Sequence, residues 1–183
     1  FIGVWWSGSE NDVKPAGAAA KGYLAGTFHG SSRDKPVHKA ILEHVYGAGK
    51  AIDPGFKDRV GEVLYNRGMI EAMWVVEAIR EAQKIHKTNN INAAMMRDGL
   101  ENLTVDAARL KELGFGENWV APVKVTCANH GGSGEVLVQQ WDGAAWKLVT
   151  DFIKPDNDVV GKLIAEDSAK YAKENNITPR DCK

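Results

Sequence analysis

The chain has 183 residues, of which 44% are hydrophobic and 26% are charged, a composition that excludes a disordered or collagen-like polymer. Lysine and arginine number 23 against 24 aspartates and glutamates, and no stretch carries one sign of charge, so we expect no nucleic-acid partner. The apolar runs fall short of the roughly 18 residues of a membrane span, and two cysteines allow one intramolecular disulfide at most.

The first residues predict a strand, a helix and a second strand. Residues 1–6 form an apolar run typical of a buried strand, and no charged leader precedes it, so we expect residues upstream of Phe1 to have been lost. A short helix is expected over 16–21 and a strand over 22–29. A parallel crossover is the simplest topology for this unit.

The middle of the chain predicts helices. Prolines and glycines bound an expected surface helix over 34–47. From 63 to 85 apolar residues recur every three or four positions, which indicates a long and mostly buried helix. Further helices are expected over 91–103 and over 104–113, the second capped by Thr104.

The last part of the chain changes to the alternating pattern of strands. Strands are expected over 123–126, 135–141 and 146–152, with a glycine-rich turn between the first two. The Asp-Gly turn between the last two is the strongest short-range signal of a hairpin. A terminal amphipathic helix is expected over 159–175. Its expected inward-facing side chains are Val160, Leu163, Ile164 and Tyr171.

Cys127 and His130 lie close together and offer two kinds of chemistry, half of a metal site or a nucleophile with its base. A closed zinc site needs four ligands and the other histidines lack paired spacing, so we predict neither a metal nor a catalytic residue. We favour a structural disulfide between Cys127 and Cys182 in an oxidising compartment, which would contribute about 4 kcal/mol through loop closure. A cysteine-dependent enzyme stays the alternative. No glycine-rich phosphate loop follows a strand, so no nucleotide or other cofactor is predicted.

Trp5, Trp6 and Ser7 are the candidate ligand-binding residues, because they stand where a strand gives way to a helix. Neighbouring strand residues face opposite sides, so if the strand stays regular one indole is expected to line a cleft while the other packs inside; burial of both in the core is the alternative. An indole favours an aromatic or planar organic ligand. Asn66 and Arg67 are further polar candidates for the cleft, with a solvated surface position as the alternative.

Five segments follow one another in a recognisable order: FIGVWWSGSENDVKPAG, AAAKGYLAGTFH, VLYNRGMIEAMWVVEAIREAQ, VKVTCANHGG and VLVQQWDGAAWKLV. In that order they resemble the C-terminal half of a type I periplasmic solute-binding protein, the receptor of ABC importers for branched-chain amino acids, amides and aromatic acids. The resemblance covers essentially the whole chain but about half of a family member. It implies an α/β fold with Rossmann-like three-layer lobes in a bilobed molecule, here truncated.

The resemblance also implies a division of the chain. Residues 1–25 would begin the C-terminal lobe, 26–135 would be a mostly helical portion of the N-terminal lobe, and 136–183 would return to the C-terminal lobe. In amino-acid-binding relatives the position matching Trp5 carries an acidic side chain that holds the ligand ammonium. The tryptophan therefore points to an aromatic carboxylate or another planar solute.

The function implied by the resemblance is capture of a small organic solute (an aromatic acid, amino acid or amide) in the periplasm and its delivery to an ABC permease in the inner membrane, without covalent chemistry. A ligand-sensing receptor on the same fold is the alternative. Because the helices would expose faces meant for a missing sheet, we expect the polypeptide to be a product of proteolysis or to associate with itself.

Overall fold

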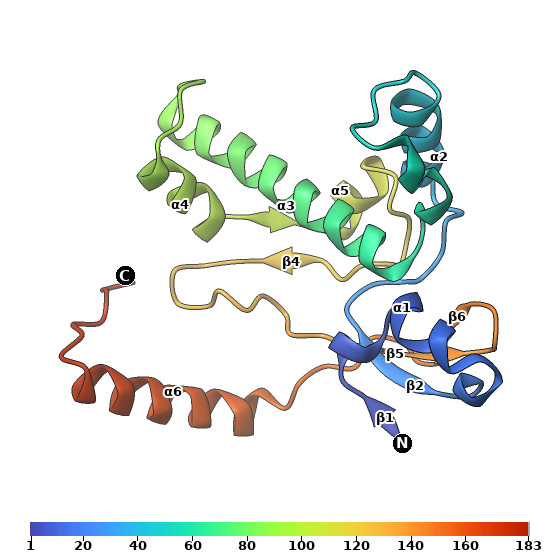
Figure 1. The fold of residues 1–183 in the computed structure, drawn as a ribbon. Coiled ribbons are helices and arrows are strands. Elements are labelled where there is room, and N and C mark those ends of the chain that lie inside the picture. The colour runs from blue at the N-terminus through green and yellow to red at the C-terminus, as the bar shows by residue number, and fades with distance from the viewer. Residues whose placement is uncertain (183) are drawn as a thin grey trace.

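The computed structural model describes residues 1–182 and contains two sheets (Figure 1). The larger sheet has the order β1-β2-β5-β6, in which β1 runs parallel to β2 and the other neighbours are antiparallel. Its strands are β1 (Ile2–Gly3), β2 (Leu24–Thr27), β5 (Leu137–Trp141) and β6 (Trp146–Leu148). The smaller sheet pairs β3 (Thr104–Val105) with β4 (Val123–Lys124), antiparallel. The parallel β1–β2 pair confirms the predicted crossover.

The connection between β1 and β2 differs from the single helix predicted there. It consists of a 3-10 turn (Trp5–Ser7), α1 (Glu10–Val13) and a second 3-10 segment (Lys14–Ala20). Ser9 caps α1 in a reciprocal arrangement with Asp12, whose carboxylate accepts hydrogen bonds from the Ser9 backbone N–H and hydroxyl. The first strand is short because the chain becomes helical at Trp5.

The long helix predicted from periodicity is confirmed as α3 (Val63–His86), which ends at Lys87 in a left-handed conformation. Before it lie α2 (Pro36–Ile41), which continues as one π-helical segment (Leu42–Tyr46), and a 3-10 segment (Pro54–Arg59). After it come α4 (Ala93–Glu101) and α5 (Ala107–Glu112). Gly99 brings α4 against α3, since a Cβ atom there would lie 2.2 Å from the Ala78 carbonyl oxygen.

The two sheets have separate hydrophobic cores. The core of the larger sheet is formed by Val13, Ala20, Ala25, Val63, Trp141 and Trp146. The second core is formed by α3, β3, α5 and the segment after α5, and it contains Ile70, Met73, Ala78, Leu103, Val105, Leu110, Phe115, Trp119 and Val120. Val63, the first residue of α3, thus belongs to the first core although the rest of its helix packs in the second. The start of α3 joins the two parts of the molecule.

Two predictions about the later elements are corrected by the structure, and one is confirmed. Thr104 lies in β3, and Asp106 caps α5 by accepting a hydrogen bond from the Arg109 backbone N–H at 2.8 Å. β4, for which no partner was predicted, pairs with β3, and the predicted hairpin between β5 and β6 is confirmed. The terminal helix forms as α6 (Asn157–Glu174), but none of its residues is buried.

The apolar face of α6 is exposed because nothing within residues 1–182 covers it. Leu163 and Ile164 are 55% and 61% exposed, and Val160 and Tyr171 are exposed as well. Figure 1 shows α6 standing apart from the two sheets. In the described part of the chain, no helix has the length and apolar character needed to cross a membrane.

Candidate functional site

The predicted ligand residues Trp5 and Trp6 lie together at the end of β1. Because they occupy a 3-10 turn, their rings do not point to opposite faces of a strand: the ring centroids are 5.4 Å apart. Trp6 is 72% exposed, and neither indole is buried in a core. The expectation of one inward and one outward indole is therefore wrong, and so is the alternative of two core residues.

An aromatic side chain that the sequence reasoning missed completes this surface. Phe28 follows β2 directly, is 41% exposed, and meets the Trp5 ring edge-on with centroids 5.6 Å apart. The carboxyl ends of parallel strands β1 and β2 lie at the same edge of the sheet, which brings Trp5 and Phe28 together.

Arg67 adds a positive charge to the aromatic side chains. Its guanidinium carbon lies 4.4 Å from the centroid of the Trp5 ring, a cation–π arrangement. Burial lowers the pKa of Arg67, while Glu71 and Asp12 act in the opposite direction; the group stays charged at neutral pH. We call Trp5, Trp6, Phe28 and Arg67 the aromatic cluster.

Ser7 stabilises the turn that presents the two indoles. Its hydroxyl donates to the Val4 carbonyl oxygen at 2.9 Å and lies 2.8 Å from the Tyr23 hydroxyl, which can then donate to it. Gly3 permits this arrangement, since a Cβ atom there would lie 1.9 Å from the Tyr23 hydroxyl oxygen. With its proton donated to Val4, Ser7 offers a ligand only a remaining acceptor position.

The structure places Asn66 in the interior, where its amide is fully occupied by protein groups. Its nitrogen donates to the carbonyl oxygens of Ser32 at 3.2 Å and Gly61 at 3.0 Å, and its oxygen lies 2.9 Å from His38 Nε2. None of the hydrogen bonds of Asn66 joins it to the aromatic cluster. It fixes the first turns of α3, and with them the backbone that carries Arg67.

His29, next to Phe28, is buried and only 3% exposed. Its Nδ1 lies 2.9 Å from the Gly30 carbonyl oxygen, which makes Nδ1 the protonated nitrogen, and Nε2 has no hydrogen-bond partner among residues 1–182. Burial lowers its pKa to about 4, opposed by the Gly30 hydrogen bond, and the nearby Arg67 lowers it further. His29 is therefore neutral at pH 7 and holds the backbone behind Phe28.

Beside the aromatic cluster, α1 meets the start of α3 through polar contacts. The Val63 backbone N–H donates to Glu10 Oε2 at 3.0 Å, and the Lys14 ammonium lies 2.8 Å from Glu62 Oε1. Arg59 donates to the Asn11 side-chain oxygen at 3.3 Å. Burial raises the pKa of Glu10 above its ordinary value, although hydrogen bonds from the Glu10 and Val63 backbones lower it.

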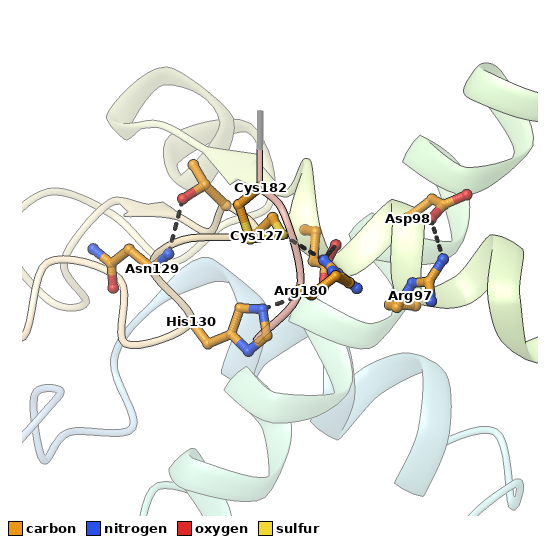
Figure 2. Close-up of a disulfide and its surroundings, with 9 residues drawn as sticks. Arg97, Asp98, Cys127, Asn129, His130, Arg180 and Cys182 are labelled. Atoms are coloured by element: carbon orange, nitrogen blue, oxygen red, sulfur yellow. Dashed lines mark hydrogen bonds and ion pairs between the residues drawn. A yellow bond between two sulfur atoms is a disulfide. The ribbon is translucent and has the colours of Figure 1, made fainter. Parts of the chain in front are cut away.

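Away from the cluster, Cys127 and Cys182 form the predicted disulfide (Figure 2). Arg180 donates to Glu101 and, at 2.6 Å, to Cys127 Sγ, and His130 Nε2 lies 3.3 Å from Glu101 Oε1. Nucleophilic catalysis needs a thiolate, and both sulfurs are bonded to each other here. Within the described residues no three metal-ligating side chains come together.

A cavity of about 230 Å³ adjoins the cluster at Phe28. It extends to Trp74 on α3 and to Val120–Val123, and its lining is largely apolar. Phe28 therefore contacts Trp5 and also lines an apolar cavity.

Comparison with solved structures gives two informative similarities. A protein from the Pseudomonas fluorescens group, described as an ABC transporter permease, matches with a TM-score of 0.90 and 40% identity over 100% of this chain and 43% of its own. A branched chain amino acid ABC transporter from Thermus thermophilus with bound valine matches with a TM-score of 0.64 and 22% identity over 86% of this chain and 40% of its own. No protein-family model and no curated protein matches. The chain thus spans less than half the length of the proteins it matches.

Proposed function

Because this chain has part of the type I periplasmic-binding-protein fold and matches ABC-transporter solute-binding proteins, we propose that it captures a small organic solute for an ABC permease in the inner membrane. Capture takes place in the periplasm and involves no covalent chemistry. The Cys127–Cys182 disulfide supports an oxidising compartment of this kind.

The ligand class follows from the aromatic cluster, the single observation that carries this proposal. Three aromatic rings provide flat apolar surfaces, and Arg67 provides a charged group with several N–H donors. A guanidinium can stack on an indole with its face while its edge binds a carboxylate with two hydrogen bonds. A planar ring that carries a carboxylate, as in benzoate or cinnamate, matches this combination better than a small amino acid does.

The division into lobes is part of the same proposal. Residues 1–25 and 136–183 form one lobe and residues 26–135 belong to the other, so the cluster draws Trp5 and Trp6 from the first lobe and Phe28 and Arg67 from the second. A ligand held between them contacts both lobes, and water is excluded from it when they close. Asn66 and Ser7 act in this site by fixing the backbone of each side.

Self-association is proposed on the exposed apolar face of α6. Leu163, Ile164 and Tyr171 lie on it, and large exposed apolar patches favour protein–protein contact. Light scattering on the 183-residue chain is expected to show a species larger than a monomer; a monodisperse monomer would contradict this part.

Calorimetry on the intact gene product tests the ligand class. Benzoate or cinnamate is expected to bind more tightly than leucine or valine, and Trp5→Ala and Arg67→Ala are each expected to weaken that binding on the order of tenfold to a hundredfold. Arg80→Ala, which removes an exposed guanidinium elsewhere on α3, is the matched control and is expected to leave the affinity unchanged. Tighter binding of leucine or valine than of any aromatic carboxylate would refute the proposal.

A further inference from the structure

Helix α3 begins without a cap of its own. The residue in the N-cap position, Glu62, makes no side-chain hydrogen bond to the first turn, and its carboxylate is engaged by Lys14 and Arg59. The first backbone N–H groups of any helix have no partner within the helix, and each helix normally obtains one from a residue just before it. In this chain the carboxylate that accepts from Val63, the first helical N–H, comes from Glu10, 53 positions earlier.

The face of α3 that carries Val63 also carries Arg67, the residue of α3 that belongs to the aromatic cluster. Val63 and Arg67 are four positions apart and therefore lie on one side of the helix. Val63 is buried in the core of the larger sheet together with Val13, and Arg67 lies over Trp5. The position of Arg67 thus depends on how the first turn of α3 is held against residues 5–13.

We call the contact between residues 5–14 and the start of α3 the joint, and two further polar contacts orient it. Lys14 pairs with Glu62 at 2.8 Å and Arg59 donates to Asn11 at 3.3 Å, so both contacts join the same two segments as the Glu10 contact. Both are solvent-exposed, and neither an exposed ion pair such as Lys14–Glu62 nor an exposed hydrogen bond such as Arg59–Asn11 contributes much. The Glu10–Val63 hydrogen bond is part-buried and joins a carboxylate acceptor to an otherwise unsatisfied helix N–H, so we expect it to contribute more than the two exposed contacts.

We propose that Glu10 is a positioning residue for the ligand site. Its carboxylate, in the segment 5–14, caps the first turn of α3 and thereby holds Arg67 over Trp5. This inference rests on the proposed function only where ligand affinity is concerned. The joint itself is a property of the free protein. The cap and the Trp5–Arg67 contact join the same two segments, residues 5–14 and 59–67, so loss of the cap releases the guanidinium from the indole.

The experiment compares Glu10→Ala, Glu10→Gln and Asp106→Ala in the intact gene product. Glu10→Ala is expected to weaken benzoate binding about tenfold, the size expected for a lost side-chain cap. Glu10→Gln, whose amide oxygen can still accept from Val63, is expected to restore most of that loss. Asp106→Ala removes a cap of similar geometry from α5, away from the cluster, and is expected to leave the affinity unchanged.

Amide hydrogen exchange without ligand separates this inference from the proposed function. Glu10→Ala is expected to speed exchange of the Val63 amide while those of Ile70 and Met73, in the middle of α3, keep their wild-type rates. If the Val63 amide exchanges at the wild-type rate in Glu10→Ala, the inference that Glu10 caps α3 is refuted, whether or not benzoate binds. An equal loss of benzoate affinity in Asp106→Ala would overturn the positioning role, since it would show a general effect of stability.

Discussion

His29 should make the stability of the fold depend on pH in a measurable way. Protonation of its Nε2 would place a charge and an unpartnered N–H in a side chain that is 3% exposed, beside the positive Arg67. The folded-state pKa is therefore about 4, against 6.5 for an ordinary histidine. Between these values the unfolded chain binds the proton and the folded chain does not, so stability is present above pH 6.5 and is lost as the pH falls towards 4.

The magnitude follows from the two pKa values. A difference of about 2.5 at about 1.4 kcal/mol for each pKa unit gives about 3.5 kcal/mol as the full loss. Urea unfolding of the wild type and of His29→Asn from pH 7.5 to pH 4 measures it, because asparagine can keep the donor to the Gly30 oxygen and cannot titrate. The wild type is expected to lose stability relative to the variant as the pH falls. A constant difference between the two proteins across this range would refute the reasoning.

Three other predictions concern stability. Cys127→Ser should lower the free energy of unfolding by about 4 kcal/mol, since the disulfide joins residues 55 positions apart, and reduced wild-type protein should match it in urea unfolding. Glu10→Gln should remove a pH dependence, because the raised pKa of Glu10 stabilises the fold below pH 4.5 and this contribution is lost as the pH rises through the folded-state pKa. In thermal unfolding, the wild type should therefore lose stability relative to the variant as the pH rises. A gain of wild-type stability with rising pH would contradict this prediction. Gly99→Ala should cost about 1–3 kcal/mol because its Cβ would lie 2.2 Å from a backbone oxygen of α3. Gly68→Ala is the control, since nothing lies within 4 Å of its Cβ position, and it should stabilise the helix by up to about 1 kcal/mol in the same assay.

The elements that could be predicted are those with local signals. Helix α3 carries apolar residues at helical spacing over its whole length, and the β5–β6 hairpin is marked by its Asp-Gly turn. The partner of β4 has no such signal, because the alternation of 123–126 is the same whether the strand pairs with β3 or with β5. The choice is made by contacts distant in sequence, which bury Val105 completely in the second core.

The cap of α5 shows how burial decides between two equivalent local choices. Thr104 and Asp106 are both good N-cap residues, and the sequence pattern does not separate them. A helix that began at Thr104 would include Val105, which the structure instead buries in β3 at no exposed surface. Asp106 is then the first residue free to cap the helix, and it does so.

The site was predictable to the extent that it depends on strand ends. Their position at the end of an expected strand identified Trp5 and Trp6 as candidates. The assumption of a regular strand failed because Val4 is the last extended residue, and the Ser7 backbone N–H donates to the Val4 carbonyl oxygen at 3.0 Å. Phe28 carries no periodic signal. The predicted parallel crossover already placed the ends of both strands at one edge, and this topology is the signal that could have identified it.

Arg67 is where the chemistry of the cluster meets the stability of the fold. A guanidinium stacked on an indole loses part of its hydration, and burial lowers its pKa accordingly. Hydrogen bonds hold the start of α3, which carries Arg67: Asn66 donates to the Gly61 carbonyl oxygen, and the Val63 N–H donates to Glu10. A carboxylate ligand would supply the countercharge that this half-buried cation has only partly in Glu71 and Asp12, so Arg67 is the residue of the cluster expected to gain most on binding such a ligand.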